Sequence, residues 1–272
     1  MKSIWIYFPV IIILFISCGE YNKVLKNPDT MVRYEYAKKY FDKGKFSRSA
    51  TLLQDIVPVM RGSSYEEEAL YLLAQSYYGM KDYTTASEYF KTYYTRYQRG
   101  EYTELARYYS AYGLYMDSPD PRLDQTDTYK SMQQFQDFLE LYPQSDKKED
   151  VQKILYELQE KLALKELMAA RLYYNLGDYI YYPFPGGNYL SCVITARNAI
   201  RSYPFSKYRE EFMYYAFKSK YEMAVQSVED KKDFRYRDVI DEYYSYINDY
   251  PTGKYIKEIK NLYEKINKEL NN

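Results

Sequence analysis

The sequence predicts an all-α fold, a solenoid of about five helical hairpins with a C-terminal capping helix. Three observations predict this fold. Aromatic and Ala residues recur at a spacing of 37, Gly and Pro number only ten each among 272 residues, and several segments end in the same Tyr-Pro pair. A fixed period of this length is typical of repeat proteins. Few Gly and Pro favour long helices over a turn-rich β fold.

The first eighteen residues are predicted to be a targeting segment. Lys2 supplies a basic start, residues 4–16 are largely apolar, and Ser17-Cys18 follows. Such a run extends about 20 Å as a helix, less than the hydrocarbon core of about 30 Å, so a signal peptide over residues 1–17 is favoured over a membrane span. A small residue followed by Cys resembles the bacterial lipoprotein signal and predicts a covalent lipid on Cys18, although Phe15 stands where Leu is usual. The alternatives are a plain secretory signal with an incidental Cys, or an N-terminal anchor helix.

Residues 18–30 are predicted to be a polar, lipidated tether. Asn27-Pro28 offers a turn, and Asp29-Thr30 offers a helix start. The residue after Cys18 is Gly rather than Asp, and in enteric bacteria Asp at that place would hold a lipoprotein at the inner membrane. Transfer to the outer membrane is therefore expected.

Three 37-residue units are predicted over residues 31–146. The recurring positions are Tyr34, Tyr71 and Tyr108; Ala37, Ala74 and Ala111; and Phe41, Tyr78 and Tyr115. A small Ala lets two helices approach closely, and residues three and four apart line one helix face. Each unit therefore predicts a helical hairpin that resembles the 34-residue tetratricopeptide repeat with a three-residue insertion.

Less regular units are predicted over residues 147–272, which comprise repeats four and five and the capping helix. Repeat four is interrupted by residues 180–188, whose Pro and Gly exclude a helix there. Residues 147–176 contain neither Pro nor Gly and could form one helix of about 45 Å. Two helices with a turn near residues 160–163 are the alternative.

The composition excludes most catalytic chemistry. His is absent, which removes imidazole acid–base chemistry, Ser-His-Asp and Cys-His nucleophiles and imidazole metal sites. Phosphate-binding glycine loops and the nucleophile elbow are also absent from the sequence. Acidic clusters at residues 66–68 and at Asp124 and Asp127 are interpreted as solvated helix surface, and Cys192 as a small buried residue. We predict no enzyme activity, no catalytic residue, no metal, and no cofactor apart from the lipid on Cys18.

The balance of positive and negative side chains limits the kinds of partner that the protein could bind. Lys and Arg together number 38, as do Asp and Glu. This balance argues against a nucleic-acid-binding arm and against a polybasic membrane patch, because either needs a clustered surplus of cations. We expect neither nucleic acid nor a small-molecule substrate.

The first three repeats are predicted to form a substrate groove. In a tetratricopeptide-like unit the concave side is lined by residues three before, one after and four after the first Ala. Rows of Tyr and Phe offer contact area at low entropy cost, which favours extended peptides with large apolar side chains. Packing of these rings under adjacent repeats or the tether is the alternative. The predicted groove residues are Tyr34, Lys38, Phe41, Tyr71, Gln75, Tyr78, Tyr108, Tyr112 and Tyr115.

Several segments resemble the BamD family of outer-membrane β-barrel assembly lipoproteins, and its Bacteroidetes branch in particular. They are residues 18–26, Ser118-Pro119 with residues 123–128, residues 162–174, and Tyr203-Pro204. The resemblance covers residues 18 to about 251 and departs from the family at residues 180–188 and in the fifth unit. It implies a lipid-anchored protein on the periplasmic face of the outer membrane that binds a BamA-like barrel insertase and unfolded outer-membrane proteins.

The resemblance also implies a partner-binding residue. Members of the family dock the POTRA domain nearest the insertase barrel on repeats four and five, through an Arg in the second helix of repeat four. Counting back from Tyr203-Pro204 places this position on Thr195, whereas the nearest Arg is Arg197, about 200° further round the helix. Either the pairing is lost or rebuilt, or the alignment shifts beside residues 180–188. We take Arg197 as the predicted contact.

Two other functions are compatible with the sequence. An anchored repeat protein could be a periplasmic scaffold for envelope enzymes. It could also be a SusD-like glycan-binding lipoprotein, although only the short insertion at residues 180–188 could hold a sugar.

Overall fold

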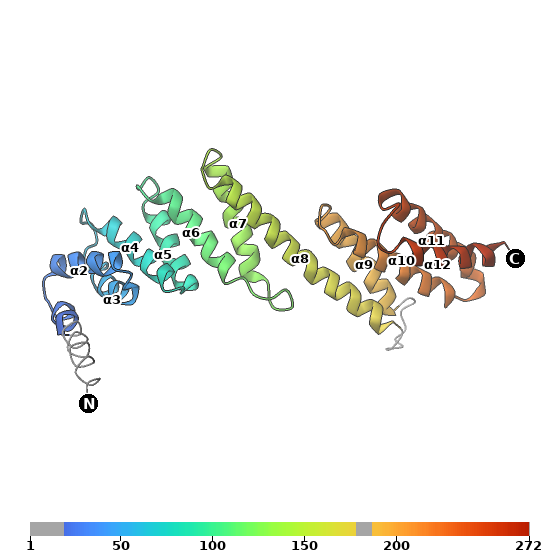
Figure 1. The fold of residues 1–272 in the computed structure, drawn as a ribbon, viewed down its shortest axis with the longest axis horizontal. Coiled ribbons are helices and arrows are strands. Elements are labelled where there is room, and N and C mark those ends of the chain that lie inside the picture. The colour runs from blue at the N-terminus through green and yellow to red at the C-terminus, as the bar shows by residue number, and fades with distance from the viewer. Residues whose placement is uncertain (1–18, 178–186, 272) are drawn as a thin grey trace, which may run out of the picture. The chain divides into compact units, whose positions relative to one another are not determined.

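The computed structural model describes residues 19–177 and 187–271, and within these ranges every regular element is a helix (Figure 1). The predicted all-α repeat fold is confirmed. Cys18 and residues 1–17, together with most of the insertion at residues 180–188, lie outside the described residues. The chain divides into two compact units. Unit 1 comprises Met1–Pro119 and Thr126–Ile154, and unit 2 comprises Asp120–Gln125 and Leu155–Asn272.

Unit 1 contains three consecutive hairpins. Their helices are α2 (Thr30–Asp42), α3 (Phe46–Ile56), α4 (Glu66–Gly79), α5 (Tyr83–Arg96), α6 (Thr103–Met116) and α7 (Thr126–Leu141). Each helix packs against the next one in the chain, which is the neighbour-to-neighbour contact pattern of a solenoid.

The hairpins form for the reasons that the repeat predicts. Ala37, Ala74 and Ala111 are fully buried, so their methyl groups set the close approach of the paired helices. An aromatic ring packs across the first hairpin turn, with the ring centroids of Phe41 and Phe46 5.4 Å apart. The turn itself needs a left-handed residue, which is Gly44 at φ 66° in the first hairpin.

One helix, α8 (Lys148–Leu176), runs without a break through the segment for which the sequence left two possibilities. The boundary between the two units falls within it, after Ile154. Its buried apolar residues are Val151, Ile154, Leu158, Leu162, Ala163, Leu167 and Ala170. Apart from the adjacent pair Leu162 and Ala163, these residues lie three or four positions apart, which follows one face of a continuous helix, so no turn is needed near residue 160.

Unit 2 continues with α9 (Gly187–Ser202), α10 (Arg209–Val225), α11 (Glu229–Asp249) and α12 (Ile256–Leu270). Helix α10 packs against both α9 and α11, and α12 packs against α10 and α11. Cys192 is fully buried in α9, as expected for a small apolar residue. Helix α12 buries Ile259 and Ile266 and leaves most of its other residues exposed, as a capping helix does.

The segment expected to be a polar tether contains a helix at residues 19–25. Its apolar residues, Tyr21, Val24 and Leu25, pack against the core of unit 1, and Val24 is buried. The next helix starts where the sequence predicts, because the Asp29 carboxylate accepts hydrogen bonds from the backbone N–H groups of Met31 and Val32.

Candidate functional site

Four of the predicted groove residues form one connected aromatic cluster on α4 and α6. The ring centroids of Tyr78 and Tyr112 are 6.2 Å apart, those of Tyr108 and Tyr112 are 5.7 Å apart, and those of Tyr112 and Tyr115 are 5.5 Å apart. Tyr78, Tyr112 and Tyr115 are half-buried. They combine ring surface with access for a ligand, as a peptide groove requires.

Two of the nine predicted groove residues are buried, and for these the expectation of an open groove is corrected. Tyr34 is 1% exposed and Tyr108 is 8% exposed. Tyr34 packs against Tyr65, and Tyr108 packs against Phe135 and Phe138 of α7. The 37-residue register gives their position in the helix but not the side chains that the following hairpin places over them.

Among the predicted groove residues of the second repeat, Tyr71 makes the central contacts. Its ring stacks on Tyr102, with centroids 4.3 Å apart and planes inclined by 12°. The side-chain amide of Gln75 donates a hydrogen bond of 2.9 Å to the Tyr71 hydroxyl. Burial raises the pKa of Tyr71 to about 12, and burial also raises the pKa of Tyr78 to about 12. Both phenols are therefore neutral at physiological pH and contribute contact area and hydrogen bonds rather than charge.

The predicted groove residues of the first repeat include one charged side chain, Lys38. Lys38 forms an ion pair of 2.6 Å with Glu68 on α4 and lies over the Tyr34 ring. The hydrogen bond from Lys38 lowers the pKa of the Glu68 carboxyl. Phe41 is half-buried and is held by its contact with Phe46.

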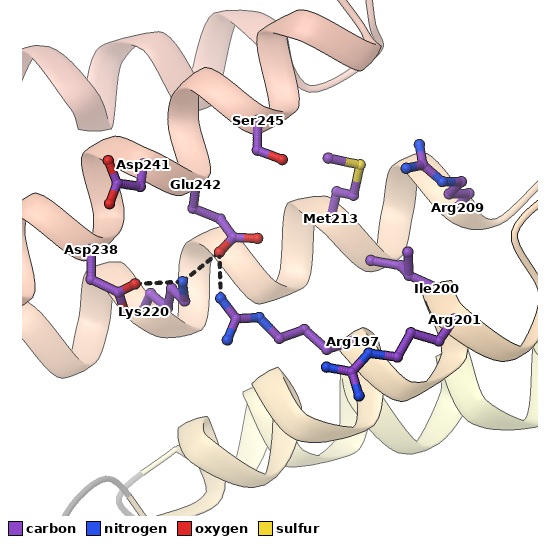
Figure 2. A pocket seen from close by; sticks show the side chains of 10 residues that line it. All are labelled: Arg197, Ile200, Arg201, Arg209, Met213, Lys220, Asp238, Asp241, Glu242 and Ser245. Carbon is purple, nitrogen blue, oxygen red and sulfur yellow. Dashed lines mark hydrogen bonds and ion pairs between the residues drawn. The ribbon is translucent and has the colours of Figure 1, made fainter.

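A second candidate site is an open hollow of about 400 Å³ in unit 2, lined by residues of α9, α10 and α11 (Figure 2). Seven of the ten residues that line it are charged. The lining residues are Arg197, Ile200, Arg201, Arg209, Met213, Lys220, Asp238, Asp241, Glu242 and Ser245. Such a surface suits a charged protein partner better than an apolar ligand.

Arg197, the predicted partner contact, is engaged within the chain. Its guanidinium donates a hydrogen bond of 3.0 Å to Glu242, toward which Lys220 also points (Figure 2). Lys220 is 4% exposed and also pairs with Asp238 at 2.9 Å. Arg197 keeps 47% of its side chain exposed, so part of its guanidinium can still face a partner.

Two charged residues of the hollow have no ion pair among the residues that the structure describes. They are Arg201 on α9 and Asp241 on α11. Arg209, by contrast, pairs with Asp249 at 2.7 Å and lowers the pKa of that carboxyl. Arg201 is therefore the guanidinium in this hollow that an acidic partner could reach without breaking an internal pair.

The sequence reasoning missed Lys220 and its acidic partners. A signal was present, because Lys220 follows Ala216 and Phe217 on the apolar face of α10 and lies where a buried residue is required. A cation in such a place must be paired. The spacing of Asp238 and Glu242, one helical turn apart on α11, supplies the pairing carboxylates.

Among the described residues, no three Cys, Asp or Glu side chains are grouped closely enough to hold a metal ion. No helix within residues 19–177 or 187–271 is both long and apolar enough to cross a membrane.

Comparison with known proteins identifies the family. Residues 26–182, more than half of the chain, match the family model YfiO, described as an outer membrane lipoprotein. The matched range includes the three hairpins of unit 1 and helix α8. Curated proteins give no match. The chain belongs to the YfiO family of outer membrane lipoproteins, the BamD-like family that its sequence resembles.

Proposed function

We propose that this chain is a non-enzymatic subunit of the machinery that assembles β-barrel proteins in the outer membrane. In this proposal it is anchored to the periplasmic face of that membrane by a lipid on Cys18, and it binds a BamA-like insertase and unfolded outer-membrane proteins. The observation that carries the proposal is the match of residues 26–182 to a family of outer membrane lipoproteins.

Unit 1 is the proposed site for unfolded substrates. The half-buried rings of Tyr78, Tyr112 and Tyr115 form a contiguous surface on two adjacent repeats. Barrel strands that end in an aromatic residue carry large apolar side chains on alternate positions, which such rings contact favourably. Binding of such strands requires an aromatic contact surface and no catalytic group.

Unit 2 is the proposed site for the insertase. Its hollow exposes the guanidinium groups of Arg197 and Arg201 beside a buried, fully paired Lys220. The two arginines offer bidentate donors to a partner carboxylate. The network around Lys220 fixes the helices that present them.

Purification from detergent-solubilised outer membrane tests the function as a whole. Recovery of a BamA-type insertase with the tagged protein is the expected result. Recovery of a peptidoglycan enzyme instead would favour the scaffold alternative, and recovery of a TonB-dependent transporter would favour the SusD-like alternative.

Lipidation has its own test. Mass spectrometry of the mature N-terminal peptide is expected to show a diacylglyceryl group on Cys18. Cys18→Ser is expected to release the protein from the outer membrane unless other subunits retain it. Normal recovery of this variant in the outer membrane, in cells that lack the other subunits, would overturn the lipid anchor.

A further inference from the structure

The start of the described chain is rigidly attached to repeat one. The helix at residues 19–25 buries Val24 in the core of unit 1. The Tyr21 ring packs edge-on against Tyr40, with centroids 5.7 Å apart, and the Arg48 guanidinium lies 5.1 Å from the Tyr21 centroid. Glu20 forms an ion pair with Lys39 at 3.7 Å. The residue that follows Cys18 therefore belongs to the folded body rather than to a long tether.

These contacts also fix which part of repeat one lies beside residue 19. Tyr40 and Lys39 are in the last turn of α2, and Arg48 is in the first turn of α3. The helix at residues 19–25 thus begins next to the turn between α2 and α3 and runs back toward the start of α2. The α2–α3 turn is thus the part of repeat one that lies beside Glu20 and Tyr21, at the start of the described chain.

This part of the molecule is basic, although the whole chain is neutral. Residues 19–48 contain eight Lys or Arg and four Asp or Glu, whereas residues 49–272 contain 29 and 34. Five cations on the short helix and around the α2–α3 turn form what we call the basic edge: Lys23, Lys39, Lys43, Lys45 and Arg48. Lys23, Lys43 and Lys45 are exposed and have no ion pair among the described residues.

The geometry points to a membrane-facing role for the basic edge: it binds the anionic headgroups of the lipid surface into which the Cys18 lipid inserts. This inference rests on the lipid attachment at Cys18 in the proposed function. A lipid on the residue that precedes a packed helix brings the α2–α3 turn to within about a Debye length of the headgroups, which is about 8–10 Å at physiological salt. Each Lys or Arg at an anionic surface contributes about 1 kcal/mol, or about fivefold in binding. The edge would hold repeat one against the membrane in a fixed orientation, which the lipid alone does not do.

The inference revises the expectation, drawn from the overall charge balance, that argued against a polybasic membrane patch. Balance over the whole chain conceals a local surplus, because the surplus acid lies in later repeats. Only the local charge near the anchor acts on the headgroups, since salt screens more distant charges.

The test uses the mature lipidated protein with a fluorophore on Ser47→Cys, beside the α2–α3 turn. Ser47 is exposed, and the native Cys192 is buried, so labelling is selective. The protein is reconstituted into phosphatidylcholine vesicles with or without phosphatidylglycerol, and energy transfer to a headgroup-labelled lipid is measured. Transfer is expected to be higher with phosphatidylglycerol and to fall when salt is raised from 0.1 to about 1 M.

Charge variants make the test specific. Lys43→Gln with Lys45→Gln is expected to remove most of the gain due to phosphatidylglycerol. Lys257→Gln with Lys260→Gln, a matched pair on exposed positions of α12, is expected to leave it unchanged. Equal transfer in both vesicle types, or equal loss in both variants, would overturn the basic edge. Absence of the lipid from Cys18 by mass spectrometry would instead refute the anchor, and reconstitution would then fail for every variant.

Discussion

The hydroxyl of Tyr93, at the end of α5, donates a hydrogen bond of 2.5 Å to the carboxylate of Glu67, at the start of α4. The same carboxylate accepts the backbone N–H of Glu101, and the Tyr93 oxygen accepts the backbone N–H of Tyr102. One acid on the first helix of a repeat thus fixes the turn that leads into the next repeat.

This arrangement recurs along the chain. In unit 2, Tyr246 donates to Glu210 at 2.7 Å, and its oxygen accepts the backbone N–H of Tyr255. Where the Tyr is absent, a Ser in the turn takes its place: Ser145 donates to Glu104, and Ser206 donates to Glu160. The solenoid is therefore stabilised at successive junctions by a carboxylate and a hydroxyl, in addition to its apolar core.

Removing the hydroxyl should destabilise each junction. We expect Tyr93→Phe and Tyr246→Phe each to lower the free energy of unfolding by about 1.5–3 kcal/mol, because each breaks a hydrogen bond to a charged group. Urea unfolding followed by circular dichroism measures the loss. Tyr129→Phe, at an exposed position of α7, is the control and should change stability by less than about 0.5 kcal/mol. Equal effects at all three positions would contradict the role of the junction hydroxyls.

Acid should weaken unit 1 through Glu66. Burial alone would raise the pKa of this carboxyl, but hydrogen bonds from Gly62 and Tyr97 and the Arg96 guanidinium outweigh burial, so its pKa lies below the ordinary value of 4.5. Because the folded pKa is lowered, this stabilisation is complete above about pH 4.5 and is lost as the pH falls through the folded value. Glu66→Gln should lower stability at neutral pH and flatten its decline below pH 4.5. The control Glu140→Gln, on an exposed site, should keep the wild-type decline, and an unchanged decline in Glu66→Gln would refute this prediction.

The proposed peptide groove can be tested on its half-buried rings. Tyr78→Ala and Tyr112→Ala should each weaken binding of a peptide that ends in an aromatic residue by about 1–3 kcal/mol if these rings are anchors. Fluorescence anisotropy with a labelled C-terminal strand peptide measures the affinity, and circular dichroism confirms the fold. Tyr108 is unsuitable for this test because it is buried and its loss would leave a core cavity. Tyr129→Ala is the matched control, and unchanged affinity in Tyr78→Ala and Tyr112→Ala would show that these rings only pack.

The sequence alone was sufficient for the fold because the repeat is visible in it. Equivalent Ala positions at a spacing of 37 predict the hairpins, and the structure buries all three of those Ala residues. The helix at residues 19–25 was not predicted, because Glu20, Lys23 and Lys26 give the segment a polar composition. Its apolar residues Tyr21, Val24 and Leu25 do lie three and four apart, so helical periodicity was a better guide there than composition.

The candidate site was predictable only in part. Periodicity places Tyr71, Tyr78 and Tyr112 on the first helices of their repeats, but it does not give the exposure of each ring. Tyr34 and Tyr108 are covered by side chains from the following turn or helix, and such long-range packing is not encoded in a 37-residue register. The ion pair of Arg197 with Glu242 joins residues 45 positions apart in the sequence, so no local sequence pattern predicts it.

That ion pair determines how the insertase contact should be tested. Arg197→Glu would add a carboxylate beside Glu242, so a loss of binding in that variant could reflect disruption of the charge network that Glu242 forms with Lys220. Arg197→Gln avoids this problem, because Lys220 still neutralises Glu242 and the amide can still donate to it. In the proposed complex an acidic side chain of the insertase binds the two exposed guanidinium groups. Arg201→Glu should therefore abolish co-purification of the insertase, since a reversed charge at such a contact costs several kcal/mol of binding free energy.

Arg197→Gln should reduce co-purification without lowering the thermal midpoint of unfolding. Arg237→Gln, at an exposed position of α11 outside the hollow, is the matched control and should bind as the wild type does. Raised salt should weaken the wild-type complex, because salt screens the charge contact of Arg197 and Arg201 with the partner's acid. If Arg201→Glu and Arg197→Gln both recover the insertase in wild-type amounts, the hollow on α9, α10 and α11 is not the docking surface, and the contact must be sought elsewhere on unit 2 or on unit 1.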